Sequence, residues 1–393
     1  MVSRRMMIGG GAGAAILAAL GYRIWDRGAL SGPEGDAYSP WNEWRGGGVD
    51  GEKRPLHAAI LAANPHDTQP WLFEVHESSI TVLADRARHL GSFDPFRREM
   101  HLGLGAAIEN LVRAAGAEGY SAYVRPVQGR LKDSPGPEPV VVAHITLDPG
   151  AGGRDPLFEA IADRHTNRGV YLDKSIAPEM LHALAQLSAT EEVLVAFVSD
   201  PHARASMAAL IVEATARIIA DPQMSADSAH WIRTGRREVD AHRDGISIDA
   251  AGLSPLLVAF AKLMPDQSAA SADQYWLANT RDIQVHAPVL GVVLVRNRLD
   301  MASTITAGRV WQRMHLAATT MGIAAQPLNQ PVECVDRNAM LGRSDTFQKA
   351  LVDLALAPGW QPTFAFRLGY AEKRALPSPR RPLSDVIRRS GFA

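Results

Sequence analysis

The spacing of apolar side chains predicts a chain of alternating strands and helices. Two segments, 100–115 and 310–321, repeat their apolar residues at helical spacing. Shorter apolar runs, bounded by turn residues, have the length and pattern of strands. Strands interleaved with helices predict an α+β fold, in which helices pack around antiparallel-rich sheets. Strands are expected at 71–75, 80–83, 140–147, 193–198, 289–295 and 363–368.

An internal repeat relates the two predicted helices. A shift of 203 positions places Gly105 on Gly308 and Gly119 on Gly322, and it also matches an alanine pair within each helix. Each helix is expected to end at the second glycine of its set, because glycine is favoured just past a helix C-terminus. A chance match between alanine-rich helices is the alternative. The shared glycine ends favour a duplicated unit, with halves at 31–150 and 151–393.

The second half is longer because of an extra segment at about 220–285. Its leucine-rich stretch, 253–264, predicts a helix with a broad apolar face. Long insertions in compact domains often cover binding sites, so this segment is a candidate lid. The alternative is an ordinary packing helix.

Composition excludes several classes of function. The chain has 393 residues, of which 46% are hydrophobic, so a sizeable core can form. Its net charge of −1 and the lack of a basic repeat predict no nucleic-acid partner. The single cysteine, Cys334, excludes an internal disulfide and a cysteine-rich metal site. No His-Glu-x-x-His motif occurs, so no metal site is expected.

The first 30 residues differ from the rest of the chain. Arg4 and Arg5 precede a glycine-rich apolar run that lasts to about Leu20, which is the layout of a secretory signal and resembles a twin-arginine signal. Segment 1–30 is interpreted as a signal or anchor. This predicts export by the twin-arginine route and a periplasmic or membrane-anchored location; without a signal, the location would be cytoplasmic. A dinucleotide-binding glycine motif at 8–15 is the alternative, but no buried strand precedes it.

A polar, turn-forming run, 64–70, leads directly into the first predicted strand. Pro65 and Pro70 bias their neighbours away from helix. Such a junction brings side-chain donors and acceptors to the end of a sheet, where a flat polar ligand can be held. An ordinary connection without chemistry is the alternative.

A second candidate site is basic. Arg164, Thr166 and Arg168 alternate in the sequence, so their side chains face one way on an extended backbone. Two guanidinium groups and a hydroxyl on one side suit a phosphate, which arginine binds through two hydrogen bonds. A solvated basic turn is the alternative. Arg380 and Arg381 form another basic patch near the C-terminus.

Together these features resemble the nitroreductase-like FMN-binding proteins, and most closely the Acg-type branch, in which two nitroreductase units are fused in one polypeptide. The resemblance spans about 54–388. It implies tandem duplicated nitroreductase-like units that form a fused pseudo-dimer, with one FMN at the seam between the halves. Its marks are the runs 68–71, 164–168, 326–330, 368–370 and 380–383.

The resemblance assigns the FMN phosphate to the basic residues. Arg164, Thr166 and Arg168 match the family's Arg-x-Ser/Thr-x-Arg run, which grips the phosphate. Arg380 or Arg381 matches the basic residue near the C-terminus that joins this grip. The first half has no recognisable copy of the run, so one flavin per chain is expected.

The resemblance also places the 64–69 loop near the flavin. Asn64, Pro65 and His66 lie where the first half approaches the cofactor, and Asp67 and Gln69 follow in the same loop. The sequence departs from the family at two positions. Asp67 stands where the family usually has asparagine, and Asn64 stands where it usually has a small residue.

The implied function is that of an FMN-dependent oxidoreductase of nitroreductase type. Such an enzyme takes electrons from NAD(P)H and reduces a small flat acceptor, a nitro compound or a quinone-like molecule, through flavin N5. No side-chain nucleophile is needed, and the sequence assigns no catalytic residue. The alternative is an FMN-binding or storage protein whose lid limits turnover. A membrane-anchored redox partner is a third hypothesis. The chain is expected to be a monomer that acts as a pseudo-dimer, with membrane association through its N-terminal segment.

Overall fold

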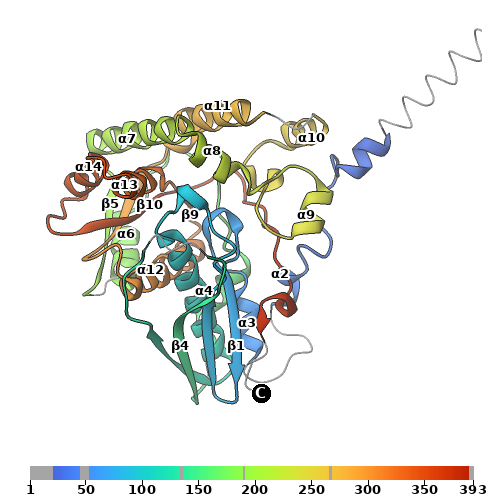
Figure 1. Cartoon of the computed structure of the whole chain (residues 1–393), viewed down its shortest axis with the longest axis vertical. Coiled ribbons are helices and arrows are strands. Elements are labelled where there is room, and N and C mark those ends of the chain that lie inside the picture. Colours follow the sequence, from blue (N-terminus) through green and yellow to red (C-terminus); the bar gives the residue numbers. More distant parts are fainter. Residues whose placement is uncertain (1–20, 45–52, 133–135, 189–190, 265–267, 389–393) are drawn as a thin grey trace, which may run out of the picture.

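The computed structural model describes residues 21–44, 53–132, 136–188, 191–264 and 268–388. Two main sheets and the helices around them form an α+β fold, as the sequence predicts (Figure 1). Of the predicted signal or anchor segment, 1–30, residues 1–20 lie outside the described residues, whereas 21–30 are described. None of the described helices is long and apolar enough to cross a membrane.

The first sheet has five strands in the order β11-β1-β2-β4-β3. The pairs β1–β2, β2–β4 and β4–β3 are antiparallel, whereas β11, at the C-terminal end, pairs parallel with β1. The last strand of the chain therefore completes the sheet of the first half. The bounds are β1 (Trp71–His76), β2 (Ser79–Ala84), β3 (Tyr120–Pro126), β4 (Val140–Pro149) and β11 (Ile387–Arg388).

The second sheet has four antiparallel strands in the order β5-β8-β10-β9. Every residue of β8 is buried, because helices and neighbouring strands cover both faces of this central strand. A two-stranded sheet, β6 with β7, belongs to the 220–285 insertion. The bounds are β5 (Val193–Val198), β6 (Ile232–Arg233), β7 (Ile246–Ser247), β8 (Val289–Val295), β9 (Ala324–Pro327) and β10 (Gln361–Gly369).

Two long helices, α4 (Arg98–Ala117) and α12 (Met301–Thr320), cross at the centre of the molecule. They touch through Gly105 and Gly308, because a Cβ atom on Gly105 would collide with the Ile305 carbonyl oxygen. A Cβ atom on Gly308 would collide with the carbonyl oxygen of Leu102. The two glycines that the repeat aligned therefore occupy the same contact, one from each helix.

Both long helices end as the sequence predicts. Gly119 and Gly322 follow α4 and α12 with positive φ angles of 89° and 71°. Glycine adopts this left-handed conformation without the steric cost that a Cβ atom adds. Strands β3 and β9 begin one and two residues after these glycines.

Several other helices begin where a capping side chain precedes a proline. Asp155, Asp200, Asp221 and Ser254 each accept a hydrogen bond from a first-turn N–H group, and a proline follows each of them. The side-chain acceptor satisfies an N–H group that has no helical partner, and proline presets φ for the first turn.

The 220–285 insertion is mostly helical, and the predicted helix at 253–264 is confirmed as α10. Helices α7, α8 and α11 lie along the end of the molecule opposite β1 and β4 (Figure 1). The remaining bounds are α2 (Pro40–Glu43), α3 (Arg54–Ala59), α5 (Pro156–Glu159), α6 (Pro178–Ser188), α7 (Pro201–Ile219), α8 (Pro222–Ala229), α9 (Arg236–His242), α10 (Pro255–Leu263), α11 (Ala269–Asn279), α13 (Gln330–Met340) and α14 (Phe347–Leu354), with short turns at Pro65–Asp67, Gly91–Phe93, Ala160–Ala162, Ile248–Ala251, Thr280–Gln284 and Leu383–Asp385.

Candidate functional site

A pocket forms where the two predicted site segments meet. The loop before β1 and the basic run at 164–168 face each other across it, and the C-terminal arm at 376–380 closes one side. It contains about 420 Å³ of empty space, counting the solvent at its mouth. Its lining residues are Ala63, Asn64, Asp67, Arg164, His165, Thr166, Arg168, Ile246, Ala250, Leu376, Ser378 and Arg380.

The basic run lies extended along the edge of the second sheet. Thr166 forms a parallel bridge with Ala325 of β9, and the N–H group of Asn167 donates to the Ala325 carbonyl oxygen at 3.1 Å. This extended backbone places Arg164, Thr166 and Arg168 on the pocket wall, as their alternation predicts.

Arg164 and Arg380 form the buried floor of the pocket. Each side chain is only 2% exposed. Arg164 donates to the Leu61 carbonyl oxygen at 2.8 Å, and Arg380 donates to that of Ala62 at 3.1 Å. The guanidinium of Arg380 also lies 4.9 Å from the ring centre of Trp41. Burial, followed by the charge of Arg380, lowers the pKa of Arg164 to about 9.

The pocket carries an uncompensated positive charge. Three guanidinium groups line it, those of Arg164, Arg168 and Arg380, and Asp67 is the one carboxylate among the lining residues. The Nε atoms of Arg164 and Arg380 are buried and have no hydrogen-bond partner among the described residues. Buried donors are rarely left unpaired, and an excess of two positive charges matches a phosphate dianion.

Asp67 is the internal counter-ion of this cluster. Its Oδ1 atom accepts hydrogen bonds from Arg380 Nη1 at 2.6 Å and from Asn64 Nδ2 at 3.1 Å, whereas Oδ2 has no partner. Burial raises the pKa of Asp67 to about 6, although Arg380 opposes the shift. The aspartate at this position therefore places a carboxylate directly on a pocket arginine.

The loop that presents Asp67 is strained. His66, Asp67 and Gln69 have φ angles of 46°, 54° and 50°, a left-handed region that non-glycine residues rarely adopt. Asn64 Oδ1 holds the loop by accepting from the Gln69 N–H group at 2.7 Å. The N–H group of Gly245 donates to the Asp67 carbonyl oxygen at 3.1 Å. Such strain is typical of functional sites whose surroundings impose one conformation.

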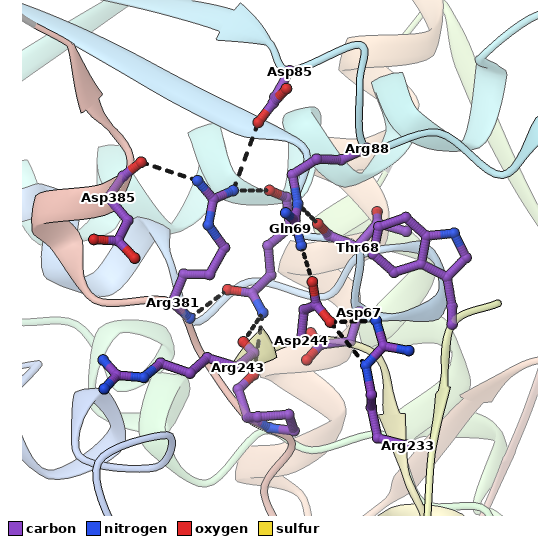
Figure 2. Close-up of polar contacts among 12 residues, drawn as sticks. Asp67, Thr68, Gln69, Asp85, Arg88, Arg233, Arg243, Asp244, Arg381 and Asp385 are labelled. Atoms are coloured by element: carbon purple, nitrogen blue, oxygen red, sulfur yellow. Dashed lines mark hydrogen bonds and ion pairs between the residues drawn. The ribbon is translucent and has the colours of Figure 1, made fainter. Parts of the chain in front are cut away.

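Gln69 and Arg381 do not line the pocket. They tie the loop to the C-terminal arm and to the insertion (Figure 2). Gln69 Oε1 accepts from the Arg381 N–H group at 2.8 Å, and Gln69 Nε2 donates to the Arg243 carbonyl oxygen at 2.8 Å. Arg381 also donates to the Asp385 carbonyl oxygen at 2.9 Å. These two side chains position the wall of the pocket.

Pro65 and His66 also point away from the pocket. A Cβ atom added to Gly103 of α4 would lie 2.9 Å from Pro65 Cδ, so this proline packs on the helix. His66 Nε2 lies 3.0 Å from Ser228 Oγ, and its ring meets the edge of Phe93. Of the four loop residues from 64 to 67, Asn64 and Asp67 face the pocket.

The insertion covers one side of the pocket. Ile246 and Ala250 are lining residues, and Arg168 Nη1 donates to the Ala250 carbonyl oxygen at 3.2 Å. Asp244 anchors the segment through ion pairs with Arg233, at 2.7 Å, and with Arg88 of the first half (Figure 2). The insertion, which the sequence makes a candidate lid, thus contributes part of the wall of the candidate pocket.

Two further residues of the site were missed by sequence analysis. His165 lines the pocket, and its ring meets Trp41 at a centroid distance of 4.5 Å. Burial, aided by the charge of Arg164, lowers the pKa of His165 to about 3, so the ring is neutral. Trp41 Nε1 donates to the Ser378 carbonyl oxygen at 2.8 Å. Tyr38, Trp41 and Trp44 recur every three residues, and this aromatic pattern is a sequence signal that could have identified Trp41.

No model of a known protein family matches this chain. Two proteins named "Putative NAD(P)H nitroreductase", from two strains of Mycobacterium tuberculosis, are 26% identical over 342 residues, which is 84% of this chain and 89% of each relative. This similarity extends over most of both chains.

Among solved structures, the FMN-dependent nitroreductase NfnB of Mycobacterium smegmatis in complex with NADPH has a TM-score of 0.39 and 19% identity, covering 60% of this chain and 98% of its own. A nitroreductase with bound FMN from Desulfitobacterium hafniense has a TM-score of 0.36 and 16% identity, with the same coverage. The chain is thus similar in sequence, over most of its length, to proteins named as nitroreductases.

Proposed function

We propose that this chain is an FMN-dependent oxidoreductase of the nitroreductase type. It takes electrons from NAD(P)H and reduces a small flat acceptor, such as a nitro compound or a quinone. The observation that carries the proposal is the cluster of Arg164, Arg168 and Arg380, of which Arg164 and Arg380 are buried and have unpaired Nε donors. With the one carboxylate of Asp67, the cluster has an excess of two positive charges. The name of the mycobacterial relatives supports the reaction class.

The residues present fit the phosphate end of FMN. A phosphate monoester carries about −1.5 to −2 charges at pH 7 and has three strong acceptor oxygens. Arg164 and Arg380 supply donors from the floor of the pocket, and the Thr166 hydroxyl lies on its wall.

When bound, FMN supplies the hydride chemistry at flavin N5. The contribution of this chain is to bind, orient and shield. Arg164 and Arg380 are held by backbone carbonyl groups, so their donors are oriented before the ligand arrives. His165 stays neutral and adds no charge to the cluster. Ile246, Ala250 and Leu376 place apolar surface at the pocket and reduce its contact with water.

We further propose that the fold is a fused pair of nitroreductase-like units of the Acg type, with halves at 31–150 and 151–393. Support comes from the reciprocal contact of Gly105 and Gly308 between α4 and α12. The pocket takes Asp67 from the first half and the basic run from the second, so one chain completes the site. A monomer would then perform the role of a dimer.

The N-terminal segment, 1–30, is proposed to be a signal or anchor of the twin-arginine type. The protein would then act outside the cytoplasm or at a membrane. Its support is the arrangement of Arg4 and Arg5 before the uncharged apolar run. Fusion of the segment to a reporter exported only by the twin-arginine route tests this part of the proposal.

A storage protein is the second candidate function. The insertion favours this function because Gly252 packs so closely on the backbone of Arg168 and Gly169 that a Cβ atom there would collide with it. Ala250 of the same segment lines one side of the pocket. A lid held in this way would admit FMN but exclude a second substrate.

Flavin reduction separates the two functions. The purified chain is loaded with FMN, and its absorbance is followed under anaerobic conditions with NADPH, before and after addition of a nitroaromatic compound or a quinone. Bleaching by NADPH followed by recovery with the acceptor supports the oxidoreductase. A yellow protein that stays oxidised supports storage, and a chain without affinity for FMN contradicts both.

A further inference from the structure

Helix α10 exposes an apolar face to solvent. Leu256, Leu257 and Phe260 are 80%, 54% and 61% exposed, and Met264, just past the helix, is 40% exposed. At about 100° per residue these four positions fall within about 100° of the helix circumference. The opposite face carries the two buried residues of α10, Val258 and Lys262. The helix therefore shows its more apolar side to the outside.

The first described segment of the chain lies against this helix. Lys262 Nζ donates to the carbonyl oxygens of Gly28 and Ser31 at 3.0 and 3.2 Å, and Arg23 Nε donates to that of Leu263 at 3.1 Å. Lys262 also forms an ion pair of 2.9 Å with Asp249. This ion pair ties α10 to the pocket-covering segment, the part of the insertion that contributes Ile246 and Ala250 to the pocket. Segment 21–31 and α10 thus form one corner of the molecule (Figure 1).

Segment 21–31 adds its own exposed apolar side chains to that corner. Trp25 is 68% exposed, Leu30 is 84% exposed and Tyr22 is 56% exposed. The rings of Tyr22 and Trp25 are neighbours, with centroids 6.0 Å apart. We call the combined surface the apolar corner; it consists of Tyr22, Trp25, Leu30, Leu256, Leu257, Phe260 and Met264.

The sequence that precedes the apolar corner identifies its partner. From Met6 to Tyr22 the chain has no charged residue, and arginines flank this run at both ends, Arg5 before it and Arg23 after it. An apolar run bounded by basic residues, with tryptophan and tyrosine at one end, is the pattern of a segment that enters a lipid bilayer. A run that enters the bilayer brings the apolar corner, which follows it in the chain, to the membrane surface.

We propose that the apolar corner rests in the interfacial layer of a lipid bilayer, so that α10 is a second membrane contact beside the N-terminal segment. Trp25 and Tyr22 are residue types enriched at that depth, because their rings are apolar and their N–H or O–H groups reach water. Leu256 and Phe260 insert from a helix that lies in the interface plane. Because the corner continues from the chain's own uncharged run, a bilayer explains the corner better than a second copy of the chain.

This arrangement fixes the orientation of the protein on the membrane. The insertion that carries α10 also supplies Ile246 and Ala250 to the pocket. Binding of α10 to lipid therefore holds the pocket-covering segment at the membrane side of the molecule. The inference rests on the proposal that the N-terminal segment acts as an anchor, and it does not depend on FMN binding.

A site-specific label tests the position of α10. Cys334 is the only cysteine in the chain and is buried, so an introduced cysteine is the site that a thiol-reactive dye modifies. Phe260→Cys and Leu356→Cys are labelled with an environment-sensitive dye in the full chain. Leu356 is the matched control: it is 87% exposed and lies in the turn between α14 and β10, away from α10 (Figure 1). Unmodified protein carried through the same labelling confirms that Cys334 does not react.

The labelled proteins are mixed with vesicles of phosphatidylcholine and phosphatidylglycerol. The dye at position 260 is expected to shift to shorter wavelength and to be quenched by a nitroxide placed high on the acyl chain. The dye at 356 is expected not to change. Vesicle binding with a silent label at 260 would overturn the proposal, as would a label that responds to protein concentration without lipid, which is the signature of a second copy.

A paired substitution tests the energetic contribution. Leu256→Gln with Phe260→Gln should lower the vesicle partition coefficient of the full chain on the order of tenfold or more, because the interface loses two apolar side chains. Leu356→Gln should leave it unchanged. Circular dichroism of each variant checks that the fold is retained. Equal partitioning of the paired variant and the wild type would show that α10 does not contact lipid.

Discussion

Arg380 Nη1 donates a hydrogen bond of 2.6 Å to Asp67 Oδ1, which joins the C-terminal arm to a loop 313 residues earlier in the chain. Both side chains are buried, and both line the candidate phosphate pocket. The contact makes Asp67 a competitor of any anion that binds Arg380. The same ion pair that stabilises the pocket without a ligand therefore opposes the binding of an anion to Arg380.

Asp67→Asn should bind FMN more tightly than the wild type. The amide oxygen can still accept from Arg380, but the negative charge that competes with the phosphate is gone. We expect the dissociation constant to fall about tenfold, which corresponds to about 1.4 kcal/mol. Quenching of FMN fluorescence during titration measures the change. Weaker binding by this variant would show instead that Asp67 contacts the ligand favourably.

Arg164→Ala combined with Arg168→Ala should release FMN from a folded protein. Each charge-assisted hydrogen bond lost costs about 1.5–3 kcal/mol, so affinity should fall about a hundredfold or more. Equilibrium dialysis of the FMN-loaded protein measures this loss. Arg217→Ala is the control, because that side chain is 70% exposed and distant from the pocket. If the double variant retained FMN as the wild type does, the phosphate site would lie elsewhere.

Glu109→Gln should strongly destabilise the fold. This buried carboxylate pairs with three arginines: Arg113 at 2.8 Å, Arg309 at 3.1 Å and Arg313 at 2.9 Å. These arginines, in spite of its burial, hold the pKa of Glu109 at about 2. Removing the shared partner leaves clustered positive charges between α4 and α12.

We expect Glu109→Gln to lower the free energy of unfolding by about 3–5 kcal/mol in urea denaturation. The control is Glu213→Gln, which removes an exposed ion pair with Arg217 and should cost less than about 1 kcal/mol. A change of similar size in both variants would contradict a structural role for the Glu109 cluster.

Gly308→Ala should open the crossing of the two long helices. The added methyl group meets the Leu102 carbonyl oxygen, so α4 and α12 must move apart, at a cost of about 1–3 kcal/mol or more. Gly116→Ala is the matched control, because nothing lies within 4 Å of its added Cβ atom. Alanine has the higher helix propensity, so this control should stabilise the protein by up to about 1 kcal/mol. Thermal denaturation measures both effects, and equal melting temperatures would contradict the close contact.

His165→Gln should make the protein less sensitive to acid. The fold lowers the pKa of His165 from 6.5 to about 3. The neutral ring therefore stabilises the folded protein fully above pH 6.5, and this contribution is lost as the pH falls from 6.5 to about 3. Between about pH 6 and pH 4 this histidine lowers the free energy of unfolding by up to about 1.4 kcal/mol for each pH unit of acidification. The variant should lack that part of the slope.

The pH experiment must separate His165 from Asp67. The pKa of Asp67 is raised, so its contribution to stability changes in the opposite direction and is lost as the pH rises through about 6. His66, with its pKa lowered to about 4, acts in the same direction as His165. Asp67 and His66 are present in both the wild type and His165→Gln. The difference between the urea unfolding curves of these two proteins therefore isolates His165. Parallel pH profiles would contradict its neutral state in the fold.

The regular elements were predictable because their signals are local. The six expected strands are all present, with ends that differ by at most two residues. Helices α4 and α12 were visible in apolar spacing, and their glycine ends follow from the freedom of glycine at positive φ. The other five strands in the described residues, β3, β6, β7, β9 and β11, were not among those expected. The short strands β9 and β11 form because they pair with distant segments, and their composition does not indicate strands.

The candidate site was only partly visible in the sequence. The alternation of Arg164 and Arg168 was enough to place both on one face. Gln69 and Arg381 were assigned to the ligand with them, but they bond to each other and position the loop. Nothing near His165 in the sequence indicated that Trp41, far away in the chain, would pack against its ring.

The sequence by itself determined what short-range sterics and periodicity control: the strands, the two long helices, their glycine ends and the facing arginines. Only the tertiary structure decided which residues share the pocket. The chain folds a loop with three left-handed non-glycine residues against a C-terminal arm and an insertion. That strain and the burial of Arg380 beside Asp67 are stable because packing from distant segments compensates them, and no local pattern records such compensation.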